Sequence, residues 1–292
     1  MRLSSSWRLR RDKSRDSAAM SNTKLLARYR IDSPRKVSLK DWNTDDTGPF
    51  TEKDEAAAAL AKEIALLDTL QEKLYAGHQA AMLMVLQATD TAGKDGVVRK
   101  VIGPLNAQGV SVTSFKKPTA EELSHDFLWR IHKACPAKGD IEVFNRSHYE
   151  DVLVVRVHKL APDDVIERRY EQINAFEETL ARSGTCIVKF FLHISKAEQK
   201  RRLEDRLADP NKHWKFNSGD VSERALWDQY TDAYEIAIGR CASKRAPWYI
   251  IPANKKWYRS WLIARILRHH LEALALTYPV APPEITKIKI PD

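Results

Sequence analysis

The chain has 292 residues with a net charge of +9, a hydrophobic fraction of 43% and three widely separated cysteines. Its length suits one large α/β domain or two small ones, and the lack of a long apolar run excludes a membrane-spanning helix. The cysteines exclude a cysteine-based metal cluster and favour a reducing, cytoplasmic compartment, whereas the positive field favours a polyanion as partner.

The amino terminus is basic and poor in apolar residues. Five arginines and one lysine lie within the first twenty residues, without the apolar core of a secretory signal. We interpret residues 1–22 as a disordered basic tail; an upstream extension of the coding start and a mitochondrial-type presequence are the alternatives. Residues 23–55 carry turn signals and predict an arm that wraps the domain, which spans residues 56–292.

Strand and helix patterns alternate through this domain. Apolar or alternating runs predict five strands, at residues 81–87, 110–115, 140–144, 185–194 and 248–251. Helical spacing predicts helices at residues 55–75, 93–102, from 118 onward, and at 163–183, 195–207, 222–240 and 255–276. This order predicts an α/β fold, with a mostly parallel five-stranded sheet and helices on both faces.

A lysine-bearing glycine turn follows the first strand and opens a helix. The run Asp90–Gly96 reads DTAGKDG, an arrangement that binds phosphate through backbone N–H groups and a mobile cation. It departs from the common P-loop pattern, with Ala88 in place of glycine and Asp95 in place of a hydroxyl residue. Asp90 inside the loop indicates a metal ligand, because a carboxylate among phosphates needs compensation. The alternative is an ordinary strand-to-helix turn.

Basic residues also follow the other strands, which indicates a polyanion site at the carboxyl ends of a parallel sheet. Lys116 follows the second strand, and Asn145, Arg146 and Glu150 follow the third. Asn145 stands where related enzymes have a metal-binding acid, and Glu150 restores the missing charge. Arg146 suits a phosphoryl group because its guanidinium binds oxygens in pairs. The alternative is that Arg146 and Glu150 pair on a helix surface.

Residues 200–220 combine a basic helix with a proline break and a basic, aromatic segment. A positively charged flap that covers a phosphate site has this composition. The alternative is a connecting loop whose aromatic residues belong to the core.

Several of these segments together resemble the polyphosphate kinase 2 family, whose fold is related to that of thymidylate kinase. The resemblance extends from Ile31 to Pro291 and includes ATDTAGKDG as a Walker A loop, VFNRSHYEDVLVVRVH as a Walker B region and the lid DPNKHWKFNSGD. It implies a three-layer P-loop kinase fold with a helical lid. Asn145 with Glu150 is similar to the class III branch, which phosphorylates both AMP and ADP.

The resemblance also implies roles for single residues. Lys94 and the loop amides would hold the transferring phosphate, the amides being those of Ala92, Gly93, Asp95 and Gly96. Asp90, Asn145 and Glu150 would bind Mg²⁺.

Basic residues outside the loop would handle the phosphates. Arg146 would neutralise the transferring group, with Arg202 and Arg206 closing over it from the lid helix. Lys116 would lie near the acceptor nucleotide. The donor chain would run along the basic side chains of the lid, Lys212 and Lys215.

The expected reaction is phosphoryl transfer from inorganic polyphosphate to AMP or ADP, giving ADP or ATP, by a homo-oligomer (dimer or tetramer) without nucleic-acid or membrane partners. Two alternatives remain. An ATP-dependent nucleoside monophosphate kinase shares the fold but predicts a hydroxyl at position 95. A nucleic-acid-binding protein predicts basic residues spread over one face and leaves Asp90 unexplained.

Overall fold

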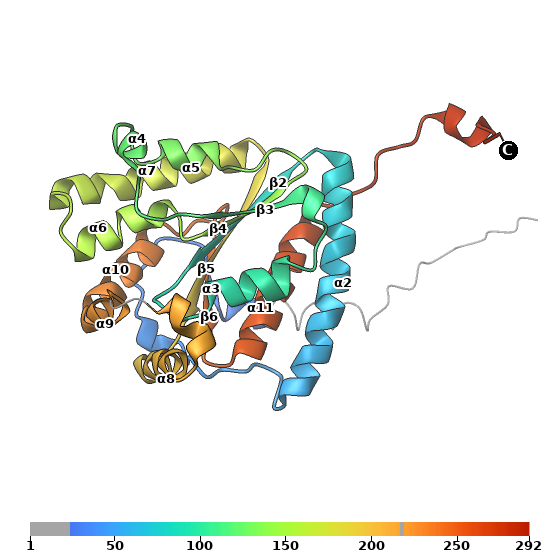
Figure 1. Cartoon of the computed structure of the whole chain (residues 1–292). Coiled ribbons are helices and arrows are strands. Elements are labelled where there is room, and N and C mark those ends of the chain that lie inside the picture. Colours follow the sequence, from blue (N-terminus) through green and yellow to red (C-terminus); the bar gives the residue numbers. More distant parts are fainter. Residues whose placement is uncertain (1–23, 217–218, 292) are drawn as a thin grey trace, which may run out of the picture.

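A six-stranded sheet forms the centre of the computed structural model, which describes residues 24–216 and 219–291 (Figure 1). The predicted tail, residues 1–22, lies outside the described residues. The order across the sheet is β1-β6-β5-β2-β4-β3. The strands are β1 (Arg30–Ile31), β2 (Ala81–Gln87), β3 (Val110–Ser114), β4 (Ile141–Asn145), β5 (Thr185–His193) and β6 (Trp248–Pro252).

The five predicted strands are present and pair in parallel, each within a residue or two of its expected bounds. The sixth strand, β1, was not predicted. It belongs to the N-terminal arm and pairs antiparallel with the edge strand β6, where Arg30 lies opposite Tyr249. Two residues are too few for alternation to reveal a strand.

Helices cover both faces of the sheet, which confirms the predicted layers (Figure 1). One face is covered by α2 (Lys53–Gly77), α3 (Lys94–Val97) and α11 (Lys256–Ala273). The other is covered by α5 (Trp129–Lys133), α6 (Val154–Val157), α7 (Asp163–Arg182) and α10 (Trp227–Arg240). The remaining helices are α4 (Ala120–Leu123), α8 (Lys196–Leu207) and α9 (Gly219–Ala225).

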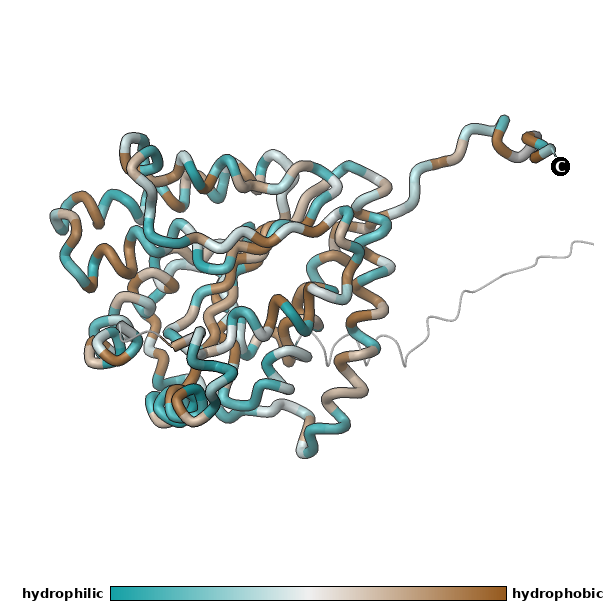
Figure 2. Tube along the Cα trace, in the orientation of Figure 1, coloured by the Kyte–Doolittle hydropathy of each residue, from teal (hydrophilic) through white to brown (hydrophobic). Residues whose placement is uncertain are grey.

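The central strand β2 is buried along its whole length because it serves two cores (Figure 2). Met82, Met84 and Leu86 pack toward α2 and α11. Leu83 and Val85 pack toward α7 and α10. Alternate side chains of a strand point to opposite faces, so a strand between two helical layers must be apolar throughout.

Two predicted helices differ in detail. The helix expected over 93–102 is a short α-helix, α3, followed by a π-helical turn at Val98–Ile102. The helix expected over 222–240 is divided into α9 and α10 at Leu226. Among the helices in the described residues, none is long and apolar enough to cross a membrane.

A buried ion pair joins α7 to the sheet. The Nζ of Lys189 donates to Glu177 and, at 2.9 Å, to the hydroxyl of Tyr149. Burial alone would raise the pKa of Glu177, but Lys189 and His148 hold it below the ordinary value. Tyr149 lies in the segment after β4, so this pair also fixes the start of that segment.

We expect Lys189→Met to lower the free energy of unfolding by about 3 kcal/mol, because it leaves a buried carboxylate without its main partner. Urea denaturation measures the loss. Lys200→Met removes an exposed lysine and should change stability by less than about 0.5 kcal/mol. Equal stabilities for the two variants would contradict a structural role for the pair.

Candidate active site

The register of the parallel strands brings three loops to one edge of the sheet. Leu86 of β2 lies opposite Asn145 of β4, and Gln87 lies opposite Phe191 of β5. The chain leaves β2 toward β4 and β3 on one side and later crosses to β5 and β6 on the other. Ligands of such sheets bind where the strand order reverses, outside the carboxyl ends of the strands.

The loop after β2 has an unusual backbone. Thr91 has a φ of 64° and Gly93 a φ of 104°, both in the left-handed region. For a β-branched residue such as Thr91 this conformation is strained by about 1–3 kcal/mol. The ammonium of Lys94 folds back to donate to the carbonyl of Ala88, 3.1 Å away. The glycine missing at position 88 is not needed, since Ala88 has no positive φ.

Ala92 does not take the expected position for binding phosphate. Its side chain is fully buried, and its N–H donates to the carbonyl of Thr89, 3.3 Å away, which closes the turn. Its amide is therefore used inside the loop. Of the predicted amides, those of Gly93, Asp95 and Gly96 remain candidates at the start of α3.

The loop after β4 faces the loop after β2. The side-chain amide of Asn145 donates to the carboxylate of Asp95, 3.0 Å away. Arg146 also has a left-handed backbone, with a φ of 63°, and its guanidinium lies 3.6 Å from the carboxylate of Asp90. Strained residues of this kind persist where the surrounding structure imposes them, most often at functional sites.

Opposite charges are concentrated between the two loops. Burial lowers the pKa of Lys94, an effect that Asp90 and Glu150 oppose. Burial raises the pKa of Glu150, and Asp90 adds to this shift, whereas Arg146 and Lys94 oppose it. The four side chains therefore act on one another. The structure thus brings together the predicted catalytic residues Asp90, Lys94 and Arg146, and Glu150, which with Asp90 was predicted to bind the metal.

A cavity of about 520 Å³ opens in front of these loops. Asp90, Arg146 and Glu150 line its floor. Although basic residues follow the strands, the charged lining of the cavity holds four acids and two bases. The charged lining residues are Asp90, Glu150, Asp220, Glu223, Lys117 and Arg146.

Helix α10 supplies an aromatic wall that was not predicted. Trp227, Tyr230 and Tyr234 line the cavity. Burial raises the pKa values of both tyrosines, and Glu150 and Asp90 add to the effect, so both hydroxyls keep their protons. In the sequence these rings stand at helical spacing, which indicates core packing rather than a site.

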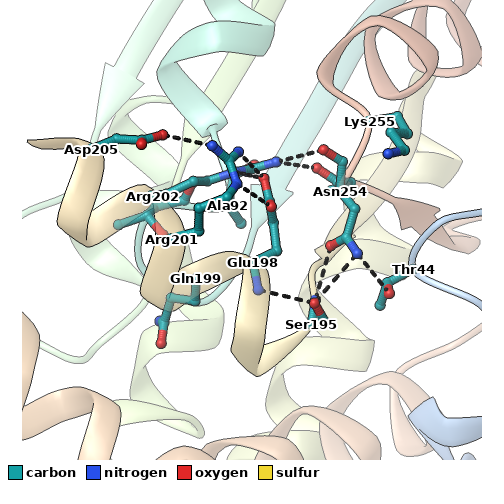
Figure 3. A network of polar contacts seen from close by, with 12 residues as sticks. Thr44, Ala92, Ser195, Glu198, Gln199, Arg201, Arg202, Asp205, Asn254 and Lys255 are labelled. Atoms are coloured by element: carbon teal, nitrogen blue, oxygen red, sulfur yellow. Dashed lines mark hydrogen bonds and ion pairs between the residues drawn. The ribbon is translucent and has the colours of Figure 1, made fainter.

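Arg202 lies behind the phosphate loop rather than over the cavity (Figure 3). It is 4% exposed, and all five of its N–H groups donate. The acceptors are Glu198 and the carbonyls of Thr91, Ala92, Ala253 and Asn254. No N–H is left for a phosphoryl group, so the predicted closure of Arg202 over the substrate is wrong and its role is to hold the loop.

The other predicted lid residues lie apart from one another. Arg206 forms an ion pair with Asp220 at 3.4 Å, which joins α8 to α9 beside the cavity. Lys212 pairs with Asp209 on the exposed turn at Pro210–Lys215. The backbone of Lys215 belongs to the same turn, and its side chain lies outside the description.

Lys116 and Lys117 differ in the hollows that they line. Lys117 lines the cavity with Asp90 and Arg146. Both lysines also line a second groove of about 450 Å³, where Arg130 and Lys133 lie. The carbonyl of Lys116 accepts a hydrogen bond from Arg130. An acceptor that contacts Lys116, as predicted, would therefore lie in this second groove. Lys117 is the lysine that lines the cavity beside Asp90 and Arg146.

The donor set of the loops fits a Mg²⁺ ion that shares its shell with phosphate. The described residues contain no group of three or more histidine, cysteine or acidic side chains able to enclose a metal. Mg²⁺ is commonly held by one or two carboxylates, with waters and substrate phosphates in the other positions. Asp90 and Glu150 supply such a pair. The amide nitrogen of Asn145 is engaged by Asp95, which leaves only its carbonyl oxygen for a metal.

Comparison with known proteins identifies the family. Residues 50–278 match the family model described as polyphosphate kinase 2. An AMP/ADP-polyphosphate phosphotransferase of Meiothermus ruber is 51% identical over 91% of this chain and 99% of its own length. An ADP-polyphosphate phosphotransferase of Rhodopseudomonas palustris is 40% identical over 87% of this chain and 92% of its own length.

Solved structures agree with this match. The crystal structure of polyphosphate kinase 2 from Arthrobacter aurescens superimposes with a TM-score of 0.84 at 48% identity, covering 89% of this chain and 92% of that one. A polyphosphate kinase 2 structure from Pseudomonas aeruginosa superimposes with a TM-score of 0.75 at 33% identity, over 79% of this chain and 49% of that one. The phosphate loop, the facing Arg146 loop and these matches together show that the chain belongs to the polyphosphate kinase 2 family.

Proposed function

We propose that this protein transfers the terminal phosphoryl group of inorganic polyphosphate to AMP and ADP. The observation that carries the proposal is the convergence of Asp90 and Arg146 at one cavity, with Lys94 close enough to interact with both. The names of the relatives given above describe phosphotransferases of polyphosphate and adenine nucleotides. The Meiothermus protein is 51% identical to this chain over 99% of its own length.

The site suits a reaction that needs charge neutralisation and alignment more than covalent chemistry. The attacking group is a phosphate oxygen of the acceptor, which is already anionic at neutral pH. Phosphoryl transfer of this kind is accelerated by positioned cations around the transferring group. Lys94 and Arg146 are such cations. The left-handed backbone of Arg146 sets the direction in which its side chain leaves the main chain.

Mg²⁺ is part of the proposal. Asp90 and Glu150 would hold the ion, with Asn145 at most an oxygen ligand or an outer contact. When bound, it neutralises phosphate charge that the acidic walls of the cavity would otherwise repel. Arg146 then keeps Asp90 in place through their ion pair.

The aromatic wall of α10 supports a nucleotide as the acceptor. A purine can stack on the rings of Trp227, Tyr230 or Tyr234. The hydroxyl of Tyr230 donates to Glu223 at 2.6 Å, which fixes its ring in the wall.

An ATP-dependent nucleoside monophosphate kinase is the less favoured alternative. It would use a hydroxyl at position 95 to bind the metal. Here Asp95 accepts a hydrogen bond from Asn145, so this side chain ties the two loops together. A cytoplasmic location and assembly into dimers or tetramers stay predictions from the family resemblance.

The donor is tested by comparing polyphosphate with ATP. With Mg²⁺ and AMP, we expect polyphosphate to yield ADP and ATP, and ATP alone to be a much poorer donor. Product analysis by chromatography across several polyphosphate lengths measures both rates. The proposal is wrong if no length of polyphosphate yields a nucleotide product, or if ATP is the faster donor.

Arg146→Ala should lower kcat by about 10³-fold, the effect typical of removing a charge-neutralising arginine at a transferring phosphoryl group. Arg182→Ala is the matched control, since Arg182 is exposed on α7 and pairs with Glu178 far from the cavity. Steady-state rates and thermal unfolding are measured for both. A kcat of Arg146→Ala within threefold of wild type would remove this residue from the mechanism.

Asp90→Asn should raise the Mg²⁺ concentration for half-maximal rate by at least about 10-fold, because an amide replaces a charged ligand. The control is Asp164→Asn, at an exposed ion pair of α7. Rates are measured over a Mg²⁺ titration at saturating polyphosphate. An unchanged Mg²⁺ requirement would show that Asp90 does not bind the metal.

A further inference from the structure

Two buried arginines share one carbonyl of the phosphate loop. The carbonyl oxygen of Ala92 accepts from Arg202 at 2.9 Å and from Arg259 at 3.0 Å. Arg202 comes from α8 and Arg259 from α11, so residues far apart in the sequence meet at the back of the loop. Arg202 also binds the carbonyl of Thr91, the strained residue of the turn.

Arg259 lies directly against the two glycines of the loop. A Cβ atom at Gly93 would come within 2.1 Å of Nη1 of Arg259, and a Cβ atom at Gly96 within 3.0 Å of Nη2. The contact at Gly93 is closer than a side chain tolerates and the contact at Gly96 is tight, so the guanidinium occupies the space that glycine leaves open. The glycines therefore leave room for the Arg259 side chain, and Gly93 also allows the left-handed backbone of the turn.

The charge of Arg259 lacks a counter-charge in the part of the chain that the structure describes. Its side chain is 3% exposed, no carboxylate of the described residues pairs with it, and its Nε has no hydrogen-bond partner there. Burial, reinforced by Arg202, lowers the pKa of Arg259 to about 9. At neutral pH the group remains charged, so two guanidinium charges lie beneath the loop with Glu198 as the partner of only one.

The shared carbonyl fixes the direction of the next amide. In a trans peptide the C=O and the following N–H point in opposite directions. Because the carbonyl of Ala92 points back to the two guanidiniums, the N–H of Gly93 points away from them. The same contacts polarise this peptide and make its N–H a stronger donor to an anion.

We propose that Arg259 is a positioning residue that prepares the phosphate loop for a polyphosphate anion, by holding the Ala92 peptide and by supplying a buried positive charge that the bound anion compensates. The inference rests on the proposed function and names a residue of α11 outside the cavity. This role differs from a purely structural one. An uncompensated buried charge at Arg259 lowers the stability of the ligand-free protein but raises its affinity for the anion.

The test uses Arg259→Met, which keeps the length and removes the charge, with Arg259→Lys as the charged variant. Binding of inorganic tripolyphosphate is measured by calorimetry, and polyphosphate KM, kcat and Tm are measured alongside. We expect Arg259→Met to bind tripolyphosphate at least 10-fold more weakly without a fall in Tm, and Arg259→Lys to recover part of the loss. Arg265→Met, six residues further along α11 and paired with Glu63, should leave tripolyphosphate binding unchanged.

Gly96→Ala provides a second variant should Arg259→Met not fold. It keeps every charge and displaces the guanidinium from the loop, so we expect tripolyphosphate affinity to fall several-fold. Unchanged tripolyphosphate affinity in the folded variants, or a loss in Arg259→Met that only matches a loss of Tm, overturns the inference. If the wild type binds tripolyphosphate but phosphorylates no nucleotide, the proposed function fails while the binding comparison still decides the role of Arg259.

Discussion

The parallel pairing of β2 with β4 on one side and β5 on the other is the constraint on which the site depends. It places the ends of these strands side by side, so Arg146 meets Asp90 and Lys94 although it is far from them in sequence. The strands keep this register because each face of β2 is buried in its own core. A shift by one residue would exchange the two faces, so the packing of the cores fixes the geometry of the loops.

The cations at this edge of the sheet fall into two groups, one near the cavity and one behind the phosphate loop. Arg146 lines the cavity and Lys94 lies in the loop beside it. Both are close to acids, so their charges are partly compensated before any ligand binds. Arg202 and Arg259 lie behind the loop and act on its backbone. The cavity itself is of mixed sign, so the proposed function places a Mg²⁺ ion in front of the loop to bind the phosphate chain together with the cations around it.

Much of the fold could be predicted because apolar runs and capping residues are local signals. The parallel strands and the Thr119–Glu122 capping box were found in this way. Side-chain direction was the main source of error. Arg202 and Arg206 stand one helical turn apart, yet the first is buried against the loop and the second pairs with α9. Arg259 and the α10 tyrosines look like parts of core helices, and only the tertiary structure shows that they adjoin the site.

The anchoring of α8 determines which part of the lid could be exchanged between relatives. Gln199 donates to the carbonyl of Asp90. Arg202, which lies beside Ala92 in Figure 3, binds the next two carbonyls of the loop. The first two turns of α8 thus support the backbone of the phosphate loop. A chimera that transplants a foreign lid should join it after Leu203, because Gln199 and Arg202, which bind the phosphate loop, both precede that point.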